Sequence, residues 1–444
     1  MDKAFRIIYQ AIDKANPEVV LRQETLLSGE ITKPSNCLDF SISHEEQINL
    51  IQNAVDNILV EKADLINKDA RDCPDCHTHL TKLGKHLSTF NDIFTDHEVK
   101  MQRLRCSGCG YEAPSTVRTF LNGNTLSGQL AKLQAELGAK HTFRDCEDIL
   151  TSFATRPRRI TNHNRVKLTT EDIGNALDAV NKATNDLVKI EEALELVLNV
   201  DGGHIKTKDK EHRSFEAMTS VLYRPEDIIS NPAKTRNHLR SKACAASTLD
   251  DGQQEMIATT IVAAITEGMT ENTNITALCD GASNCWKVVD ALTPLCKKMT
   301  SILDWFHLSM KMENISLPAD LKGKFLRIRW HLWRGNSSSA LTRLNELSEQ
   351  LKPGKALNKI KKFRTYIENN VTKIVNYRER QTQGLVFTSN LAESTVESLI
   401  NQRCKGQQHM KWTREGLNPI LQLRAQINSR DWENKWKMAV LLAL

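Results

Sequence analysis

The chain has 444 residues, of which 40% are hydrophobic and 26% charged, and this composition excludes a fibrous or an intrinsically disordered protein. The length exceeds what one hydrophobic core usually serves, so we expect about two to four domains. The net charge of +6 is too small for a chain of this length to indicate nucleic-acid binding by itself. No signal peptide is recognisable, and no run reaches the roughly 18 apolar residues that span a bilayer, which predicts a cytoplasmic protein without membrane contact.

Residues 1–70 have a polar, helical pattern and are expected to form a helical N-terminal region. Residues 71–116 contain two C-x2-C pairs separated by 29 residues. Such pairs supply the four soft ligands that structural zinc prefers, and the long spacing predicts a zinc ribbon with a long hairpin. A redox dithiol and unliganded cysteines are the alternatives, and a nearby histidine could replace a thiolate. The expected zinc ligands are Cys73, Cys76, Cys106 and Cys109.

Residues 117–190 are predicted to form a compact helical domain, with two helical patterns separated by Gly138. The run from Ile149 to Thr170 within it contains arginines but no Asp or Glu. This run could be the recognition part of a helix-turn-helix or a solvated basic loop, and the sequence favours neither. The side chains expected to contact DNA in the first case are Arg158, Arg159, Asn162 and Arg165.

Residues 191–305 alternate between strand and helix patterns. Asp201 ends an apolar run before Gly202-Gly203, where we expect a sharp turn, and the period-two pattern that follows predicts a hairpin. Further on, Asp280 and Asp304 end two strands that must be parallel, because a helical crossover joins them. Carboxylates at one sheet edge suit hard divalent cations, although Asp201 and Asp280 could equally be turn residues. Asp304 precedes His307 in a D-x-x-H pair, which suits metal support and a purely structural hydrogen bond equally.

Residues 306–385 look wholly helical and interrupt this unit, since residues 386–430 resume it with one more helix. Basic residues alternate with Trp330 and Trp333 in the insertion, which predicts either an amphipathic helix with buried tryptophans and a solvated basic face or a surface that tracks DNA. Glu393 and Glu397 share one face of the later helix, and Glu393 could also be a capping residue. Residues 431–444 are expected to form a C-terminal tail.

The order Asp, Asp, helical insertion, Glu resembles that of the DDE transposases, which have a ribonuclease-H-like fold. Within these, the chain resembles bacterial insertion-sequence transposases of the ISKra type, over roughly residues 70–430. It rests on the motifs VDGGHIK, LCDGASNCWK, ILDWFHLSMKM, IRWHLWRG and SNLAESTVESLINQRCKGQQHMKWTREG. In that family the catalytic Glu is followed at ten and twelve residues by Arg and Lys, then by Met-x-Trp and Gly. Counting from Glu393 meets this pattern at Arg403, Lys405, Met410, Trp412 and Gly416, and counting from Glu397 does not.

The resemblance implies an α/β, ribonuclease-H-like mixed sheet with an all-helical insertion, preceded by the zinc ribbon and a helical DNA-binding domain. It implies a transposase that binds terminal inverted repeats of double-stranded DNA as a homodimer and catalyses cleavage and strand transfer. The alternatives are a metal-dependent nuclease and a catalytically idle DNA-binding protein. Catalytic Mg2+ or Mn2+ would be held by Asp201, Asp280 and Glu393, with Asp304 and His307 in support. The residues expected to contact DNA near this site are Arg403, Lys405 and Lys411.

Overall fold

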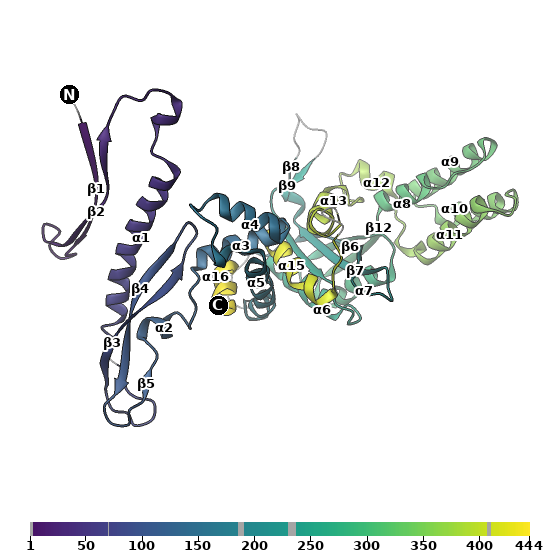
Figure 1. Cartoon of the computed structure of the whole chain (residues 1–444). Coiled ribbons are helices and arrows are strands. Elements are labelled where there is room, and N and C mark those ends of the chain that lie inside the picture. Colours follow the sequence, from purple (N-terminus) through teal and green to yellow (C-terminus); the bar gives the residue numbers. More distant parts are fainter. Residues whose placement is uncertain (1–2, 70, 185–190, 230–236, 406–409) are drawn as a thin grey trace. The chain divides into compact units, whose positions relative to one another are not determined.

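The computed structural model describes residues 3–69, 71–184, 191–229, 237–405 and 410–444 (Figure 1). The chain divides into two compact units, residues 1–169 with 440–444 and residues 170–439. Within the described ranges, no helix combines the length and the apolarity that crossing a bilayer requires.

The N-terminal region is only partly helical, so the prediction for residues 1–70 was wrong over its first half. An antiparallel hairpin comes first, β1 (Lys3–Ile12) with β2 (Val20–Ile31), followed by a 3-10 turn at Cys37–Phe40. Helix α1 (His44–Ile66) then begins at a capping box formed by Ser43 and Glu46. The hairpin leaves most of its side chains exposed, so it lacks the alternation of buried and polar residues that marks a strand in sequence.

The cysteine pairs flank a long antiparallel hairpin, β3 (Leu80–Asn91) with β4 (Asp96–Cys106), to which β5 (Glu112–Ala113) adds a short third strand. The hairpin expected for a zinc ribbon is therefore present. Its β4 strand packs against α1 through Ala63, Val99 and Met101. The short helix α2 (Thr116–Phe120) completes this cluster through Val117.

Helices follow, as the sequence predicts, but the first break differs from the predicted one. Gly138 lies buried inside α3, and the break comes at His141, after which Thr142 caps the next helix by accepting a hydrogen bond from Asp145 N. The elements are α3 (Gly128–Lys140), α4 (Phe143–Ser152), a 3-10 turn (Arg159–Thr161) and α5 (His163–Thr184).

The second unit is built on a five-stranded mixed sheet in the order β10-β7-β6-β11-β12, which confirms the mixed α/β class. The predicted hairpin is β6 with β7, and β10 is antiparallel to β7. β11 is parallel to both β6 and β12. The strands are β6 (Glu195–Lys206), β7 (Ser214–Tyr223), β10 (Ala243–Ser247), β11 (Asn274–Cys279) and β12 (Lys298–Leu303). A 3-10 turn (Pro225–Asp227) and a two-residue hairpin, β8 (Ile228–Ile229) with β9 (His238–Leu239), lie between β7 and β10.

The sheet is covered by helices on both faces. On one face Thr260 of α6 (Gln254–Thr266) bonds Ser220 of β7, and α7 (Ser283–Leu292) packs on β6 and β11. The segment after α13 (Asn390–Val396) lies on the other, where Ile400 contacts Gly203. That segment continues as a π-helical turn (Glu397–Asn401), α14 (Gln402–Cys404), α15 (Arg414–Ile427) and α16 (Trp432–Ala443). The predicted C-terminal tail is thus a helix.

The insertion at residues 306–385 is helical, as predicted. After a 3-10 turn (Thr293–Leu295) and β12, the chain enters α8 without a loop. The helices are α8 (Trp305–Glu313), α9 (Ala319–Trp333), α10 (Ser337–Glu349), α11 (Lys355–Asn369) and α12 (Tyr377–Thr382), with a 3-10 turn at Val371–Lys373.

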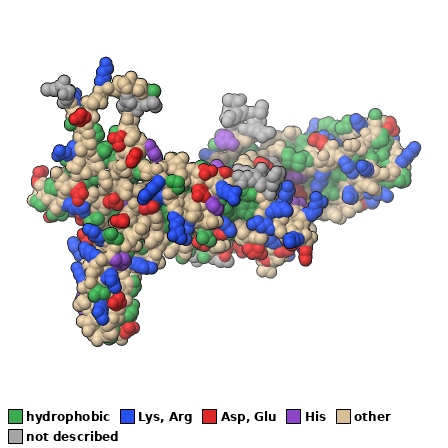
Figure 2. All heavy atoms as spheres, in the orientation of Figure 1, with side chains coloured by type: hydrophobic (Ala, Val, Ile, Leu, Met, Phe, Trp, Pro, Cys, Tyr) green, Lys and Arg blue, Asp and Glu red, His purple; other side chains and the backbone are tan. Residues whose placement is uncertain are grey.

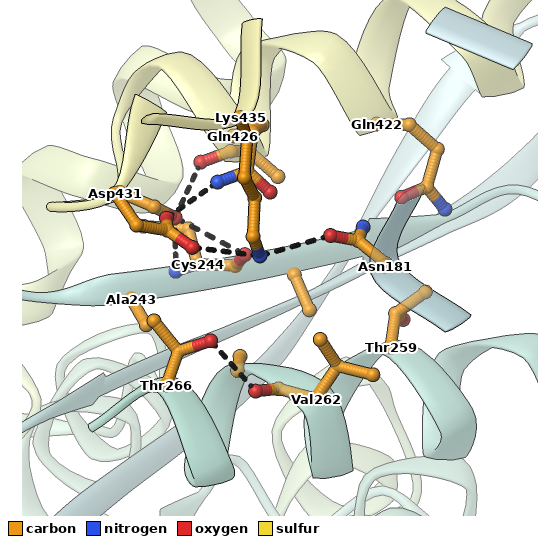
Figure 3. Close-up of a pocket in the computed structure, with 14 residues that line it drawn as sticks. Asn181, Ala243, Cys244, Thr259, Val262, Thr266, Gln422, Gln426, Asp431 and Lys435 are labelled. Atoms are coloured by element: carbon orange, nitrogen blue, oxygen red, sulfur yellow. Dashed lines mark hydrogen bonds and ion pairs between the residues drawn. The ribbon is translucent and has the colours of Figure 1, made fainter. Parts of the chain in front are cut away.

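A polar pocket beside β10 joins α16, α15 and α5 (Figure 3). Lys435 Nζ donates to Asn181 Oδ1 at 3.0 Å and pairs with Asp431 Oδ2 at 2.7 Å. Gln426 Nε2 donates to Asp431 Oδ1 at 2.5 Å. Because these buried polar groups satisfy one another, the pocket holds helices against the sheet edge.

Candidate active site

Three acids, Asp201, Asp280 and Asp304, lie in a row at the carboxyl edge of the parallel strands, and we call them the acid row. Val200 of β6 aligns with Cys279 of β11, which aligns with Leu303 of β12. Asp201, Asp280 and Asp304 each follow one of these residues, so they are neighbours on adjacent strands. Together with His307 and Ser389 they line one small pocket. The predicted parallel crossover and the shared edge of Asp280 and Asp304 are confirmed.

Asp201 is not a turn residue, because β6 continues to Lys206 and Asp201 pairs with Thr219 of β7. Its Oδ1 accepts a hydrogen bond from Gly202 N at 2.8 Å. Burial raises the pKa of this carboxyl, and the charges of Asp280 and Asp304 raise it further, against the opposing effects of His307 and Gly202 N–H. The acids therefore repel one another in a poorly solvated place, which a cation would relieve.

The glycines after Asp201 allow close approach to both faces of β6. A Cβ on Gly202 would lie 2.6 Å from Glu216 Oε1, whose other oxygen accepts from Asn284 Nδ2 at 2.6 Å. On the opposite face, a Cβ on Gly203 would lie 3.2 Å from Lys405 Nζ. The prediction of a turn at Gly202-Gly203 was wrong. The chain does not change direction there, and the two glycines are needed because other side chains pack closely on both faces of the strand. Sequence reasoning also missed Glu216, which carries no motif.

Hydrogen bonds, one of them from the helical insertion, hold Asp280 in position. Its Oδ1 accepts from Ala282 N at 2.8 Å, and Gly281 has a φ of +93°, a conformation that favours glycine. Tyr366 of α11 donates its hydroxyl to the Asp280 carbonyl oxygen at 2.7 Å. Tyr377 of α12 makes the same bond, also at 2.7 Å, to the carbonyl of Leu303, the residue before Asp304. The insertion thus satisfies buried carbonyls at the ends of both acid-bearing strands.

Asp304 joins three elements. It caps α8 by accepting from Phe306 N and His307 N, and it accepts from His307 Nδ1 at 2.7 Å. It also accepts from Ser389 N at 2.8 Å and Ser389 Oγ at 2.6 Å. With a side chain only 1% exposed, Asp304 has no free direction toward a metal, which supports the structural reading of the D-x-x-H pair.

His307 stands between two of the acids. Its Nε2 is 4.0 Å from Asp201 Oδ2 while its Nδ1 bonds Asp304. Burial lowers the pKa of His307, but the hydrogen bond to Asp304 and the charges of Asp304 and Asp201 outweigh burial and raise it above its usual value. A protonated His307 would offset part of the negative charge at this edge.

Glu393 lies on α13, but its side chain falls outside the described part of the protein. The backbone of α13 is nevertheless held at the acid row, because Ser389 bonds Asp304 and Ala392 lines the pocket. Lys242 fixes the next turn by donating to Thr395 Oγ1 at 2.7 Å. Glu397, the rejected candidate, is exposed on the π-helical turn and accepts a hydrogen bond from Asn401.

The motif that follows Glu393 forms a clasp on the end of β6. Trp412 N donates to Lys206 O at 3.0 Å, and Lys208 N donates to Trp412 O at 2.9 Å. The buried Arg403 guanidinium lies 5.1 Å from the Trp412 ring and 3.0 Å from Met410 Sδ. The expected DNA contact of Arg403 is therefore corrected to a structural role. Lys405 and Lys411 remain exposed.

Comparison with known sequences bears on this part of the chain. The sequence model of the family described as "Uncharacterised protein family (UPF0236)" matches residues 144–438. The chain belongs to this family. No curated protein matches the chain. The range shared with UPF0236 contains the acid row, the insertion and the clasp, and it begins after the four cysteines.

Arg158, at the start of the UPF0236 range, is buried and held by the protein. Its guanidinium pairs with Asp96 Oδ1 at 2.5 Å and donates to the carbonyl oxygens of Ile93, Asp92 and Thr95. Its expected DNA contact is thus corrected to a structural one. The other expected contacts in this run differ: Arg159 and Arg165 are exposed, and Asn162 Oδ1 accepts from Arg165 N at the start of α5.

The four cysteines outside the UPF0236 range converge. Cys73 and Cys109 sulfurs are 3.5 Å apart, those of Cys76 and Cys106 are 3.3 Å apart, and all four lie within 4.8 Å of one another. Tetrahedral zinc with Zn–S bonds of about 2.3 Å requires sulfur separations of about 3.8 Å, so this cluster could hold a zinc ion.

The two cysteine knuckles repeat one backbone design, which accounts for the convergence. His77 N donates to Cys73 O and Gly110 N donates to Cys106 O, at 3.0 and 3.1 Å. Both donors have left-handed φ, 58° and 79°. A nearby histidine does not replace a thiolate here, and buried His97 bonds Asp56 instead, at 2.7 Å.

The donor atoms at the acid row are carboxylate oxygens, in contrast to the sulfur atoms of the four cysteines. Among the described residues, the four cysteines are the one group of three or more side chains close enough to share a metal. Asp201 and Asp280 line the pocket with one carboxylate oxygen each bonded to a backbone N–H, while both oxygens of Asp304 are engaged in hydrogen bonds. Carboxylate oxygens that repel one another are the kind of donors that Mg2+ and Mn2+ prefer.

Proposed function

We propose that this protein is a DNA transposase of the DDE type, which cleaves the ends of an insertion sequence and joins them to target DNA. The observation that carries the proposal is the placement of Asp201 and Asp280 directly after a register pair of the parallel strands β6 and β11, beside the helix that bears Glu393. Phosphoryl transfer needs little covalent chemistry from the protein beyond positioning and charge stabilisation, which an edge of this kind can supply.

The sheet topology supports a ribonuclease-H-like core. Counted along the chain, its five main strands lie in the order 3-2-1-4-5, with the second antiparallel to the first and the last two parallel to it. The acids follow the residues Val200 on the first strand and Cys279 on the fourth, as the motif order of the DDE transposases requires. The helical insertion precedes the third acid in the same way.

In the proposed reaction, Asp201, Asp280 and Glu393 would hold divalent cations, which would supply activation of the attacking oxygen and charge stabilisation of the leaving oxygen. Water attacks the phosphorus at the element end, and the bond to the 3′-oxygen breaks. That 3′-hydroxyl then attacks a phosphodiester of the target and displaces another 3′-oxygen. Asp304 orients His307 and α13 through hydrogen bonds. Tyr366 and Tyr377 hold the ends of β11 and β12 by donating to backbone carbonyl oxygens there.

The DNA that flanks the gene provides the test. Purified protein would be incubated with labelled DNA from both flanks, a target plasmid and Mg2+. We expect nicks at the boundary of terminal inverted repeats and products in which the labelled end is joined to the plasmid. Cleaved ends without joined products under Mg2+ or Mn2+ would identify a nuclease instead. Binding without cleavage would identify an idle DNA-binding protein derived from a transposase.

A further inference from the structure

The helical insertion carries a charge that the rest of the chain does not. Residues 306–385 contain sixteen Lys and Arg against six Asp and Glu, a net charge of +10 within a chain whose total is +6. The remaining residues are therefore net negative, at −4. Figure 2 shows Lys and Arg side chains over the visible face of these helices. A positive field confined to one segment attracts a polyanion there.

Within the insertion, α9 presents a continuous exposed ridge. Three of its side chains and that of the C-cap residue Arg334 recur every fourth residue and so lie along one side of the helix, and Arg327 lies beside them. Trp330 is 58% exposed and Leu326 is 54% exposed. Among the described residues no carboxylate pairs with a basic member of this ridge. The α9 ridge consists of Lys322, Leu326, Arg327, Trp330 and Arg334.

The opposite side of α9 is firmly packed. Leu321, Ile328 and Leu332 are buried, and Phe325 meets Phe363 of α11 with ring centroids 6.1 Å apart. The exposure of Trp330 is therefore not the result of a loose helix. Of the two alternatives for this segment, the helix with buried tryptophans and a solvated basic face therefore fails at Trp330, which is largely exposed.

The carboxyl end of α9 is anchored next to the acid row. The Trp333 ring lies 4.6 Å from that of Trp305, the residue after Asp304, and 5.5 Å from that of Phe387. From this anchor the fifteen residues of α9 extend about 22 Å, the length of roughly six base pairs. The ridge therefore runs outward from the neighbourhood of the acids.

We propose that the α9 ridge binds duplex DNA on its way to the active site, with Lys322, Arg327 and Arg334 on phosphates and Trp330 against a sugar or an unstacked base. This inference rests on the proposed function and names the surface that holds the substrate. Guanidinium groups for phosphate beside an exposed ring for base or sugar are a combination suited to nucleic acid.

Charge and apolar area argue against other occupants. A second copy of the insertion would bring another +10 to the same place and be repelled. A membrane-bound helix buries a broad apolar face, but the apolar face of α9 is already covered, which leaves only Leu326 and Trp330.

The test compares full-length variants in binding to a short, labelled duplex of random sequence over a range of salt concentrations. For R327Q/R334Q we expect about a tenfold or greater loss of affinity and a salt slope smaller by about 1.8, since each phosphate contact contributes about 0.9. The matched control, K352Q/K355Q, removes the same charge from two exposed positions, one just before α11 and one at its first residue, and should change affinity less than about twofold. W330A should weaken binding about tenfold, and W330F should restore it.

Equal losses in R327Q/R334Q and K352Q/K355Q would overturn the inference, because net charge alone would then account for binding. Unchanged DNA binding in R327Q/R334Q, with loss of binding to phosphatidylserine vesicles, would overturn it in favour of a membrane. A wild-type protein that binds no duplex would overturn both this inference and the proposed function. Normal binding and cleavage by R327Q/R334Q would overturn this inference alone.

Discussion

Replacing Asp304 by Asn tests whether this buried carboxylate holds the site together. One oxygen accepts from Phe306 N and Ser389 N, and the other from His307 N, His307 Nδ1 and Ser389 Oγ. An amide has only one acceptor oxygen, so in either orientation its NH2 group faces at least one backbone N–H donor. Removing one partner of a buried ion pair costs about 3–5 kcal/mol, and we expect a loss of unfolding free energy of that size.

Urea unfolding followed by tryptophan fluorescence would measure this loss. The matched control is D320N, which removes an exposed acid from the first turn of α9 and should cost no more than about 1 kcal/mol. In D304N, release of Ser389 would also displace α13 and lower cleavage by about a hundredfold or more. A D304N protein that unfolds like D320N and cleaves like the wild type would refute the reasoning.

Three further predictions concern other parts of the chain. C106S or a strong chelator should unfold the hairpin that carries the cysteines, seen as lost protection of β4 amides in hydrogen exchange; unchanged protection would mean that no metal is held. Y366F should leave the Asp280 carbonyl oxygen without its hydrogen bond and lower the free energy of unfolding by about 1–3 kcal/mol. It should also slow DNA cleavage at saturating Mg2+ while DNA affinity stays unchanged. Cleavage at the wild-type rate would show that the bond does not position Asp280. Burial raises the pKa of the Glu267 carboxyl to about 7, against its pair with Arg430, so stability should fall by about 3 kcal/mol between pH 4.5 and pH 7. In urea unfolding, the free energy of unfolding of E267Q should not show this fall with pH. The same pH dependence in E267Q and wild type would contradict the prediction.

The acid row was predictable because its determinants are local. A strand, a helix and a strand in succession require a parallel crossover, and this alone brings Asp280 and Asp304 to one edge. The hairpin of β6 and β7 followed from the alternation that starts at Phe215. The four cysteines could be paired by spacing, because each knuckle closes through a bond within a few residues.

Other features depend on contacts that the sequence does not reveal. Trp412 bonds Thr207, the residue after β6, across 205 residues of sequence, so the burial of Arg403 on its ring could not be predicted and a DNA contact was expected instead. Likewise, Arg158 is held by a turn more than sixty residues earlier in the chain. Gly202-Gly203 has the composition of a turn, and only its neighbours on both faces of β6 show that it belongs to a strand.

The most direct measurement is cleavage of flanking DNA by the D280N protein, alongside wild type, at saturating Mg2+. We expect D280N to bind the element ends with wild-type affinity and to retain the wild-type fold but to give no nicked product, because a carboxylate that lines the pocket has been lost. D280N that cleaves at the wild-type rate would contradict the claim that the acid row is the active site.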